Sequence, residues 1–271
     1  MTDAVLRFTI LGCGSSPGVP RIGNDWGACD PREPKNRRRR ASLLVERIRP
    51  DGARTVVVID TGPDFRDQML DADVSWADGV VYTHAHADHI HGIDDLRAFV
   101  LNRRRRVDVY ADAVTMDRLM EGFGYCFRTP AGSSYPPICA AHTIKPWHSF
   151  SIDGPGGPID LLPYDQAHGD IRSLGFRIGT LAYSSDVSAM PDESAPLLRD
   201  LDVLIVDALR YTPHPSHFSL DEALVLSQVL APKRTILTHM HIDLDYNALM
   251  AKLPANVEPG YDGLVIELPA G

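Results

Sequence analysis

The stretch Thr83-His84-Ala85-His86-Ala87-Asp88-His89 directly follows an apolar run, residues 79–82, that has the composition of a buried strand. On a continuing strand the side chains at positions 84, 86 and 88 would share one face, whereas on a turn His89 comes beside Asp88. Imidazole nitrogen and carboxylate oxygen suit Zn²⁺, Mn²⁺ or Fe²⁺. The stretch therefore predicts a metal site at a strand end rather than a histidine-rich surface loop.

Three further candidate ligands stand where later apolar runs meet loops, namely His168, Asp186 and His239. Any one of them alone would more often have a structural role. Together they gain weight, because the residues from 84 to 89 cannot complete two metal coordination spheres by themselves.

Strand-like and helix-like patterns alternate in both halves of the chain, which predicts two sheets packed together with helices outside. The expected strands are 6–11, 41–47, 55–59, 79–82, 107–111, 159–163, 174–178, 180–184, 201–207 and 235–238. The expected helices are 64–70, 93–102, 113–123 and 219–230. Ser219 and Glu222 form a capping box at the start of the last helix.

No linker divides the chain, so we expect one domain over residues 1–271. Residues 124–149 are rich in Pro, Gly and Ser with interleaved aromatic residues, and they predict an insertion over the core. Loops of that length often act as lids.

The bulk composition is that of a globular protein, with 44% hydrophobic and 23% charged residues among 271. No run approaches the roughly 20 apolar residues that would span a bilayer. The N-terminal residues 1–11 include Asp3 and predict a strand rather than a signal peptide. We therefore expect a soluble, cytoplasmic protein.

The net charge of −9 argues against a broad nucleic-acid-binding face. Two arginine runs, 37–40 and 103–106, oppose this trend locally. Such runs are usually solvated surface, and the alternative is that they steer an anionic substrate.

These patterns resemble the metallo-β-lactamase superfamily, whose signature is HxHxDH. The matching segments are 12–20, 60–62, 83–89, Asp186, His217 and 238–239. The chain most resembles the PhnP-like branch, which contains phosphoribosyl cyclic phosphodiesterases, and is more distantly similar to the tRNA-processing RNase Z. The resemblance implies an α/β (α+β) fold, a four-layer αββα sandwich.

The resemblance also implies a hydrolase with two divalent ions, Mn²⁺ or Zn²⁺. By position it assigns one metal to His84, His86 and His168, the second to Asp88, His89 and His239, and the bridging role to Asp186. Two such ions can share a water, lower its pKa and clamp the oxygens of an in-line displacement, with the bridging hydroxide as nucleophile. A positively charged first shell favours a phosphate or another oxyanion.

Two residues outside the ligand set complete the expected site. In the resembling branch the residue matching His217 contacts the phosphate and acts as a general acid, and an imidazole suits that task because its pKa lies near neutrality. Asp60 lies just after a strand and is expected to orient a histidine ligand through its second ring nitrogen, or else to cap a turn. The predicted catalytic residues are Asp88 and His217.

PhnP-like proteins often carry a second, structural zinc site made by cysteines of the N-terminal loop and a histidine after the last ligand. Here only Cys29 remains in that loop. Structural zinc normally needs four ligands, so we expect none, or a weakened site of Cys29, His241 and Asp25. The four cysteines form no CxxC pair and are expected to be reduced thiols, namely Cys13, Cys29, Cys126 and Cys139.

The leading hypothesis is a phosphodiesterase that cleaves a small phosphate ester, cyclic or nucleotide-like. One alternative is an RNase Z-like tRNA 3′ endonuclease, although the chain has no obvious basic arm for tRNA. Another is a non-catalytic ligand-binding member, similar to pyrroloquinoline-quinone biosynthesis proteins. The resemblance further implies a homodimer, and no membrane partner is expected.

Overall fold

The computed structural model describes residues 4–270. Residues 1–3, which the sequence places in an N-terminal strand, lie outside the described part. The chain divides into two compact units, each assembled from separate segments. Unit 1 comprises the chain up to Thr9, Ser42–Asp160 and the chain from Val265, and unit 2 comprises Ile10–Ala41 and Leu161–Leu264.

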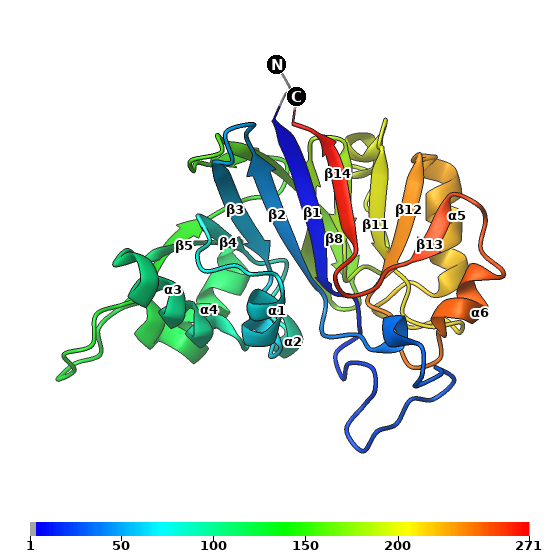
Figure 1. Cartoon of the computed structure of the whole chain (residues 1–271), viewed down its shortest axis with the longest axis horizontal. Coiled ribbons are helices and arrows are strands. Elements are labelled where there is room, and N and C mark those ends of the chain that lie inside the picture. Colours follow the sequence, from blue (N-terminus) through cyan, green and yellow to red (C-terminus); the bar gives the residue numbers. More distant parts are fainter. Residues whose placement is uncertain (1–3, 271) are drawn as a thin grey trace. The chain divides into compact units, whose positions relative to one another are not determined.

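The first of two seven-stranded sheets belongs mainly to unit 1 and is mixed. In spatial order its strands are β14 (Val265–Pro269), β1 (Val5–Gly12), β2 (Ser42–Ile48), β3 (Arg54–Ile59), β4 (Gly79–Val81), β5 (Val107–Ala111) and β6 (Cys139–Thr143). Strands β2 and β3 pair antiparallel, and β3 to β6 run parallel. Figure 1 shows β14 beside β1, although the two strands come from opposite ends of the chain.

The second sheet belongs mainly to unit 2 and is also mixed. Its order is β13 (Val257–Pro259), β12 (Arg234–Thr238), β11 (Val203–Asp207), β10 (Leu181–Ser184), β9 (Ile171–Ile178), β8 (Ile159–His168) and β7 (Phe150–Ile152). Strands β10 to β13 are parallel, and β8, β9 and β10 are antiparallel neighbours. Two mixed sheets with helices agree with the predicted α/β class.

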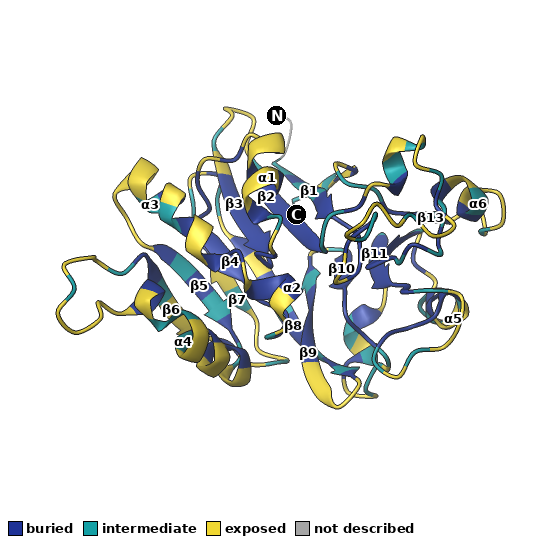
Figure 2. Cartoon of the chain, turned by 90° about the horizontal axis from the view of Figure 1, so that it is seen from below, coloured by how far each residue is buried: buried dark blue, intermediate teal, exposed yellow. Residues whose placement is uncertain are grey.

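Each unit carries its own helices. In unit 1 they are α1 (Phe65–Asp71), α2 (Ala87–Ile90), α3 (Leu96–Arg103) and α4 (Ala113–Phe127), and in unit 2 α5 (Leu220–Leu230) and α6 (Tyr246–Met250). Helix α5 has the predicted capping box of Ser219 and Glu222. Figure 2 shows that β4 is buried whereas much of α4 is exposed. No helix of the described chain is long and apolar enough to cross a membrane.

The irregular segment is shorter than the 124–149 expected from the sequence. Helix α4 continues to Phe127, and Cys139–Thr143 forms β6, which pairs with β5. Strand β6 lies among Pro, Gly and Ser residues, and its five residues are too few for a period-two alternation to reveal a strand.

The two arginine runs differ. Residues 103–106 are exposed, as expected of a solvated run. The interpretation of 37–40 as surface is wrong for Arg38, whose side chain is fully buried, and Arg39 pairs with Asp262. All four cysteines are free and buried, which agrees with the expectation of reduced thiols.

Candidate metal centre

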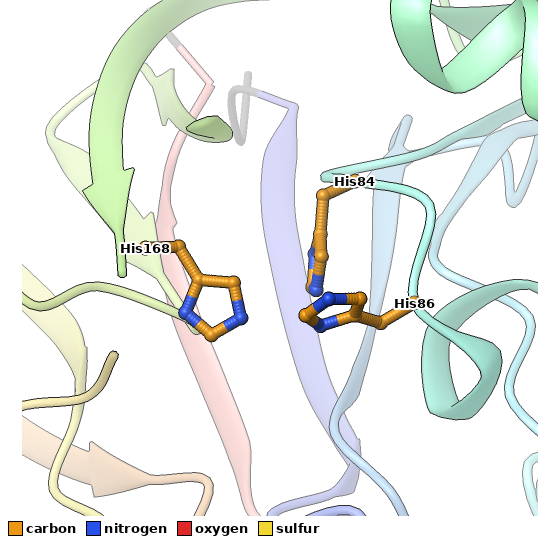
Figure 3. Close-up of side chains that lie close together, drawn as sticks. All are labelled: His84, His86 and His168. Carbon is orange, nitrogen blue, oxygen red and sulfur yellow. The ribbon is translucent and has the colours of Figure 1, made fainter. Parts of the chain in front are cut away.

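In unit 1 the His/Asp stretch lies on a turn and a short helix, not on a continuing strand. Strand β4 ends at Val81, and α2 begins at Ala87 with His86 as its N-cap. The turn brings the carboxylate of Asp88 to 3.4 Å from Nε2 of His89. The rings of His84 and His86 lie next to each other (Figure 3), and their centroids are 4.5 Å apart. The turn alternative was therefore correct for this part of the chain.

Asp60 holds the imidazole of His89 from behind. Its Oδ2 lies 2.7 Å from Nδ1 of His89, and it also accepts hydrogen bonds from the backbone N–H and hydroxyl of Thr83. With Nδ1 tied to a carboxylate, Nε2 is the nitrogen left to bind a metal, which is the usual arrangement of metal-ligating histidines. Burial raises the pKa of Asp60, and the neighbouring His89 opposes that rise.

A close backbone approach fixes the helix that carries His89. The N–H of Thr61 donates to the carbonyl of His89 at 2.8 Å, and the N–H of Gly92 donates to the carbonyl of Thr61 at 2.7 Å. A Cβ on Gly92 would lie 2.3 Å from the carbonyl oxygen of Gly62. Only glycine permits this approach, so Gly92 allows the segment 60–62 to pack directly against the region of α2.

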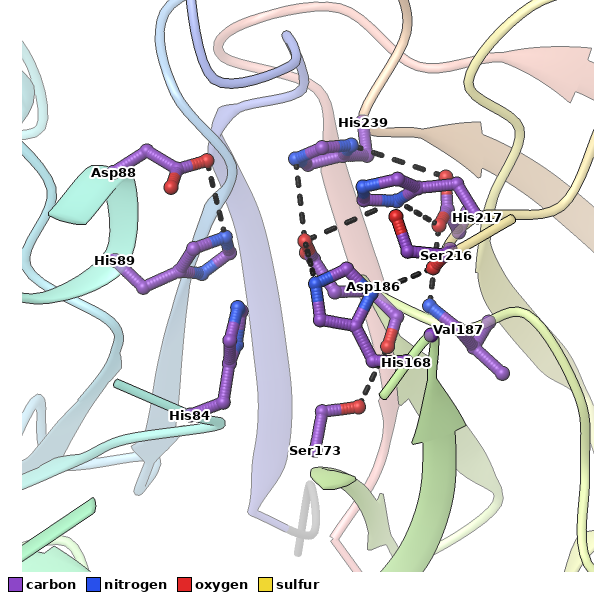
Figure 4. A network of polar contacts seen from close by, with 12 residues as sticks. His84, Asp88, His89, His168, Ser173, Asp186, Val187, Ser216, His217 and His239 are labelled. Carbon is purple, nitrogen blue, oxygen red and sulfur yellow. Dashed lines mark hydrogen bonds and ion pairs between the residues drawn. The ribbon is translucent and has the colours of Figure 1, made fainter. Parts of the chain in front are cut away.

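In unit 2 three strand ends bring the other predicted ligands together. His168 is the last residue of β8, Asp186 follows β10, and His239 follows β12. Nε2 of His168 lies 3.7 Å and Nε2 of His239 lies 3.5 Å from Oδ2 of Asp186 (Figure 4). All three side chains are buried. The geometry thus gathers two imidazoles around one carboxylate.

The backbone around these ligands is held in place. Nδ1 of His168 lies 2.6 Å from the carbonyl oxygen of Ser216, which leaves Nε2 for a ligand. The hydroxyl of Ser173 donates to the carbonyl of Asp186 at 2.6 Å. His239 has a left-handed backbone with φ of 56°, a conformation that is uncommon for residues other than glycine.

His217 lies beside this group and is paired with Asp207, a residue that the sequence analysis missed. Nδ1 of His217 lies 2.7 Å from Oδ2 of Asp207, which also accepts from the N–H of Val187 at 3.1 Å. The His217 ring stacks on the His239 ring at 4.6 Å. Asp207 is fully buried and closes β11. A strand that ends in Asp was the signal for it, the same signal that singled out Asp186.

Both units carry donor groups that suit divalent cations, and those of unit 2 converge. In unit 2, atoms of His168, Asp186 and His217 lie within 4.8 Å of one another, and so do atoms of Asp207, His217 and His239. In unit 1, His84, His86, Asp88 and His89 supply three imidazoles and a carboxylate. Nitrogen and oxygen donors of this kind bind Zn²⁺, Mn²⁺ or Fe²⁺.

The expected weak site at Cys29 has a cationic neighbour. Cys29 Sγ donates to the carbonyl of Ile242 at 3.3 Å and lies 3.9 Å from a nitrogen of the buried Arg38 guanidinium. His241 contacts Asp243 instead, at 3.1 Å. Among residues 4–270, no group of three converging ligand atoms includes Cys29 or His241. A guanidinium so close to the thiol disfavours a second cation, and the site stays a prediction.

Comparison with known proteins identifies the family. The β-lactamase superfamily domain matches residues 55–240, so the chain belongs to this family. A crystal structure described as a new diphosphatase from the PhnP family is similar at 37% identity with a TM-score of 0.86, covering 97% of each chain. The predicted family, branch and fold class are confirmed, and the chain has the metallo-β-lactamase fold.

Curated relatives carry other names. A protein named octanoyltransferase from Porphyromonas gingivalis is 32% identical over 96% of this chain, which spans only 51% of that relative. Coenzyme PQQ synthesis protein B of Xanthomonas axonopodis pv. citri is 24% identical, with 93% of this chain and 86% of the relative covered. The short form of human tRNase Z shares the fold at 17% identity and a TM-score of 0.60, covering 96% and 98%.

Proposed function

We propose that the chain is a dinuclear metal-dependent phosphodiesterase acting on a small phosphate ester, cyclic or nucleotide-like, or on a diphosphate. The observation that carries this proposal is the Asp207–His217 pair, which lies beside the ligand group of Asp186. A buried carboxylate that orients an imidazole next to metal ligands is suited to protonating an alkoxide or phosphate leaving group. The similarity to a PhnP-family diphosphatase supports the phosphate substrate class.

The proposed ligands are those expected from the sequence. His84, His86 and His168 would hold one ion, Asp88, His89 and His239 would hold the other, and Asp186 would serve as a ligand shared by both. Divalent ions at such a site supply Lewis acidity and neutralise phosphate charge. His/Asp sites bind both Mn²⁺ and Zn²⁺, so the ion bound in the cell depends on which of them is available there.

The side chains of unit 2 handle the proton. As the P–O bond breaks, Nε2 of His217 gives its proton to the departing oxygen, and the electron pair of the bond stays on that oxygen. The imidazole returns to the acid form by taking a proton from solvent, and the attacking water releases its proton to solvent, so the step balances. Asp207 accepts a hydrogen bond from Nδ1 throughout and favours the imidazolium over the neutral ring.

Acyl transfer is not proposed for this chain. A thiol nucleophile must ionise and reach its substrate, but all four cysteines are buried, and burial raises the pKa of each. The octanoyltransferase is about twice as long as this chain, so its name describes a larger protein.

One set of assays tests the proposed function. Protein loaded with Zn²⁺ or Mn²⁺ is expected to bind two equivalents and to hydrolyse bis-p-nitrophenyl phosphate, 2′,3′-cyclic nucleotides or a nucleoside diphosphate. Cleavage of precursor tRNA alone would favour the nuclease alternative. Full metal content with no turnover would favour the ligand-binding alternative. Light scattering on the same sample tests the proposed homodimer.

A further inference from the structure

The loop that carries His217 is closed at its neck by backbone hydrogen bonds. We call residues 211–217 the His217 loop. The N–H of Leu209 donates to the carbonyl of Phe218 at 2.9 Å, and the N–H of Leu220 donates to the carbonyl of Arg210 at 2.9 Å. The N–H of Phe218 also donates to the carbonyl of Val187 at 2.7 Å. The ends of the loop are therefore fixed, and what remains is how its interior is ordered.

Two side chains order the interior of the His217 loop. The Arg210 guanidinium donates to the carbonyls of Thr212 at 3.1 Å and Pro213 at 2.8 Å. Further along, Nδ1 of His214 lies 3.3 Å from the N–H and 3.2 Å from the hydroxyl of Ser216. A backbone N–H can only donate, so Nδ1 of His214 accepts and the ring carries its proton on Nε2.

Ser216 connects this contact to a predicted ligand. Its carbonyl oxygen lies 2.6 Å from Nδ1 of His168. A carbonyl can only accept, so Nδ1 of His168 holds the proton and Nε2 keeps its lone pair. Gly169, which follows His168, has φ of +59°, and a Cβ on it would lie 2.8 Å from Cβ of Ser216. Ser216 is therefore in close contact with the end of β8, with no room for a side chain at position 169.

We propose that His214 is a positioning residue that sets the tautomer and direction of His168 through Ser216. By accepting from the N–H and hydroxyl of Ser216, it holds the Ser216 carbonyl against Nδ1 of His168. The same contact shapes the turn just before His217, whose ring centroid lies 5.3 Å from that of His214. This inference rests on the proposed function in one respect, namely that His168 binds metal.

Burial and the neighbouring His217 lower the pKa of His214, which agrees with a neutral ring. The alternative to a positioning role is that His214 only fills space in the loop as a half-buried side chain. The two differ in what they require of residue 214. Positioning requires an acceptor at the place of Nδ1, whereas a space-filling role requires only a ring.

Two variants separate these requirements. His214→Asn keeps an acceptor oxygen near the place of Nδ1, whereas His214→Phe keeps a ring beside His217 but has no acceptor. Zn²⁺ affinity is measured by competition with a chromophoric chelator. We expect the Asn variant to bind like the parent and the Phe variant to bind about tenfold more weakly, as for other partners behind metal ligands. Far-UV circular dichroism and thermal unfolding confirm that both variants fold.

A second readout does not need metal. In the metal-free protein, ¹⁵N spectra of the His168 ring report which nitrogen is protonated. The parent and the Asn variant are expected to show a proton on Nδ1, and the Phe variant a mixture. A Phe variant equal to the parent in affinity and tautomer would overturn the proposal, and so would an Asn variant that behaves like Phe. A parent that binds no Zn²⁺ would refute the proposed function, while the spectra would still decide the role of His214.

Discussion

At the scale of single residues, the pairing of Asp207 with His217 has a direct kinetic consequence. Replacing Asp207 by Asn keeps the size of the side chain but removes the charge that favours the protonated imidazole. We expect kcat on a diester substrate to fall by about 10²-fold or more, within the range that general acids contribute. KM should change little, because Asp207 is buried and does not reach solvent.

The chain offers a matched control for that variant. Asp108 and His142 form another carboxylate–imidazole pair at 2.7 Å, but theirs lies on the exposed part of unit 1. Asp108→Asn should therefore leave kcat unchanged. Equal losses in the two variants would mean that the Asp207 effect is not specific to the proposed acid.

A second residue makes stability depend on pH. Asp262 is largely enclosed, with its side chain 11% exposed, and burial raises its pKa from 3.8 to about 6 against the opposing effect of Arg39. The folded state then holds this proton more tightly than the unfolded state, so stability falls as pH rises from about 4 to about 6.

Asp262→Asn removes this titration. Relative to the parent, the variant should gain up to about 3 kcal/mol in unfolding free energy between pH 4 and pH 7. Denaturant unfolding at several pH values measures the difference. A difference between the two proteins that stays constant over that range would contradict a raised pKa at Asp262.

Residue chemistry was the part of the site most readable from sequence. His84 to His89 stand close together in the chain, so their clustering follows from local geometry. Asp207 was missed although it closes a predicted strand, because a single carboxylate after an apolar run is common. Its partner His217 is ten residues away, and only the loop between them brings the pair together.

At the scale of elements, the packing of α2 against the segment 60–62 depends on Gly92. The 2.3 Å approach of a Cβ to the Gly62 carbonyl would push α2 away from the segment 60–62. We expect Gly92→Ala to destabilise the protein by about 1–3 kcal/mol, the usual cost of overpacking, and to weaken metal binding. Thermal unfolding and metal titration measure the two effects.

Gly122 provides the comparison for Gly92. It lies within α4, and nothing stands within 4 Å of a Cβ built there. Gly122→Ala should stabilise α4 by roughly 0.5–1 kcal/mol, because alanine loses less backbone entropy in a helix. If Gly92→Ala were equally harmless, the close approach at α2 would not be a constraint.

The elements that sequence predicted well are those with complete local signals. Helix α5 has a capping box, an apolar face and a following proline, and β5 was predicted with its observed bounds, Val107–Ala111. Helix α2 was not predicted, because four residues cannot show a helical period. It forms through tertiary contacts, with Thr61 bonded to the carbonyl of His89.

At the scale of the whole molecule, chain order does not reveal which segments fold together. Strand β14 lies at the C-terminal end of the chain and pairs with β1, and each unit is assembled from segments far apart in sequence. No local pattern carries that information, since partners so distant are chosen by packing and hydrogen bonding together. The alternation of strands and helices predicts two sheets with helices, but it does not reveal which segments join each sheet.

Metal removal should act on the whole molecule. The proposed ligands come from loops and strand ends throughout the chain, and an unfolded chain does not present them together, so metal binds the folded state far more tightly. At a free Zn²⁺ concentration of 100 times Kd, binding stabilises the fold by about 2.7 kcal/mol. For a chain of this size we expect the chelated protein to melt roughly 5–10 °C lower than the loaded one.

Two variants show whether that shift arises at the proposed ligands. Asp186→Asn removes the proposed bridging carboxylate and should abolish most of the metal-dependent rise in Tm. Asp202→Asn changes another carboxylate of unit 2, one paired with Lys233 at 2.5 Å, and should keep the full rise. Because the metal-free Tm of each variant is its own reference, any general loss of stability cancels. A rise that survives in Asp186→Asn would place the stabilising ion elsewhere, and the bridged assignment would then be wrong.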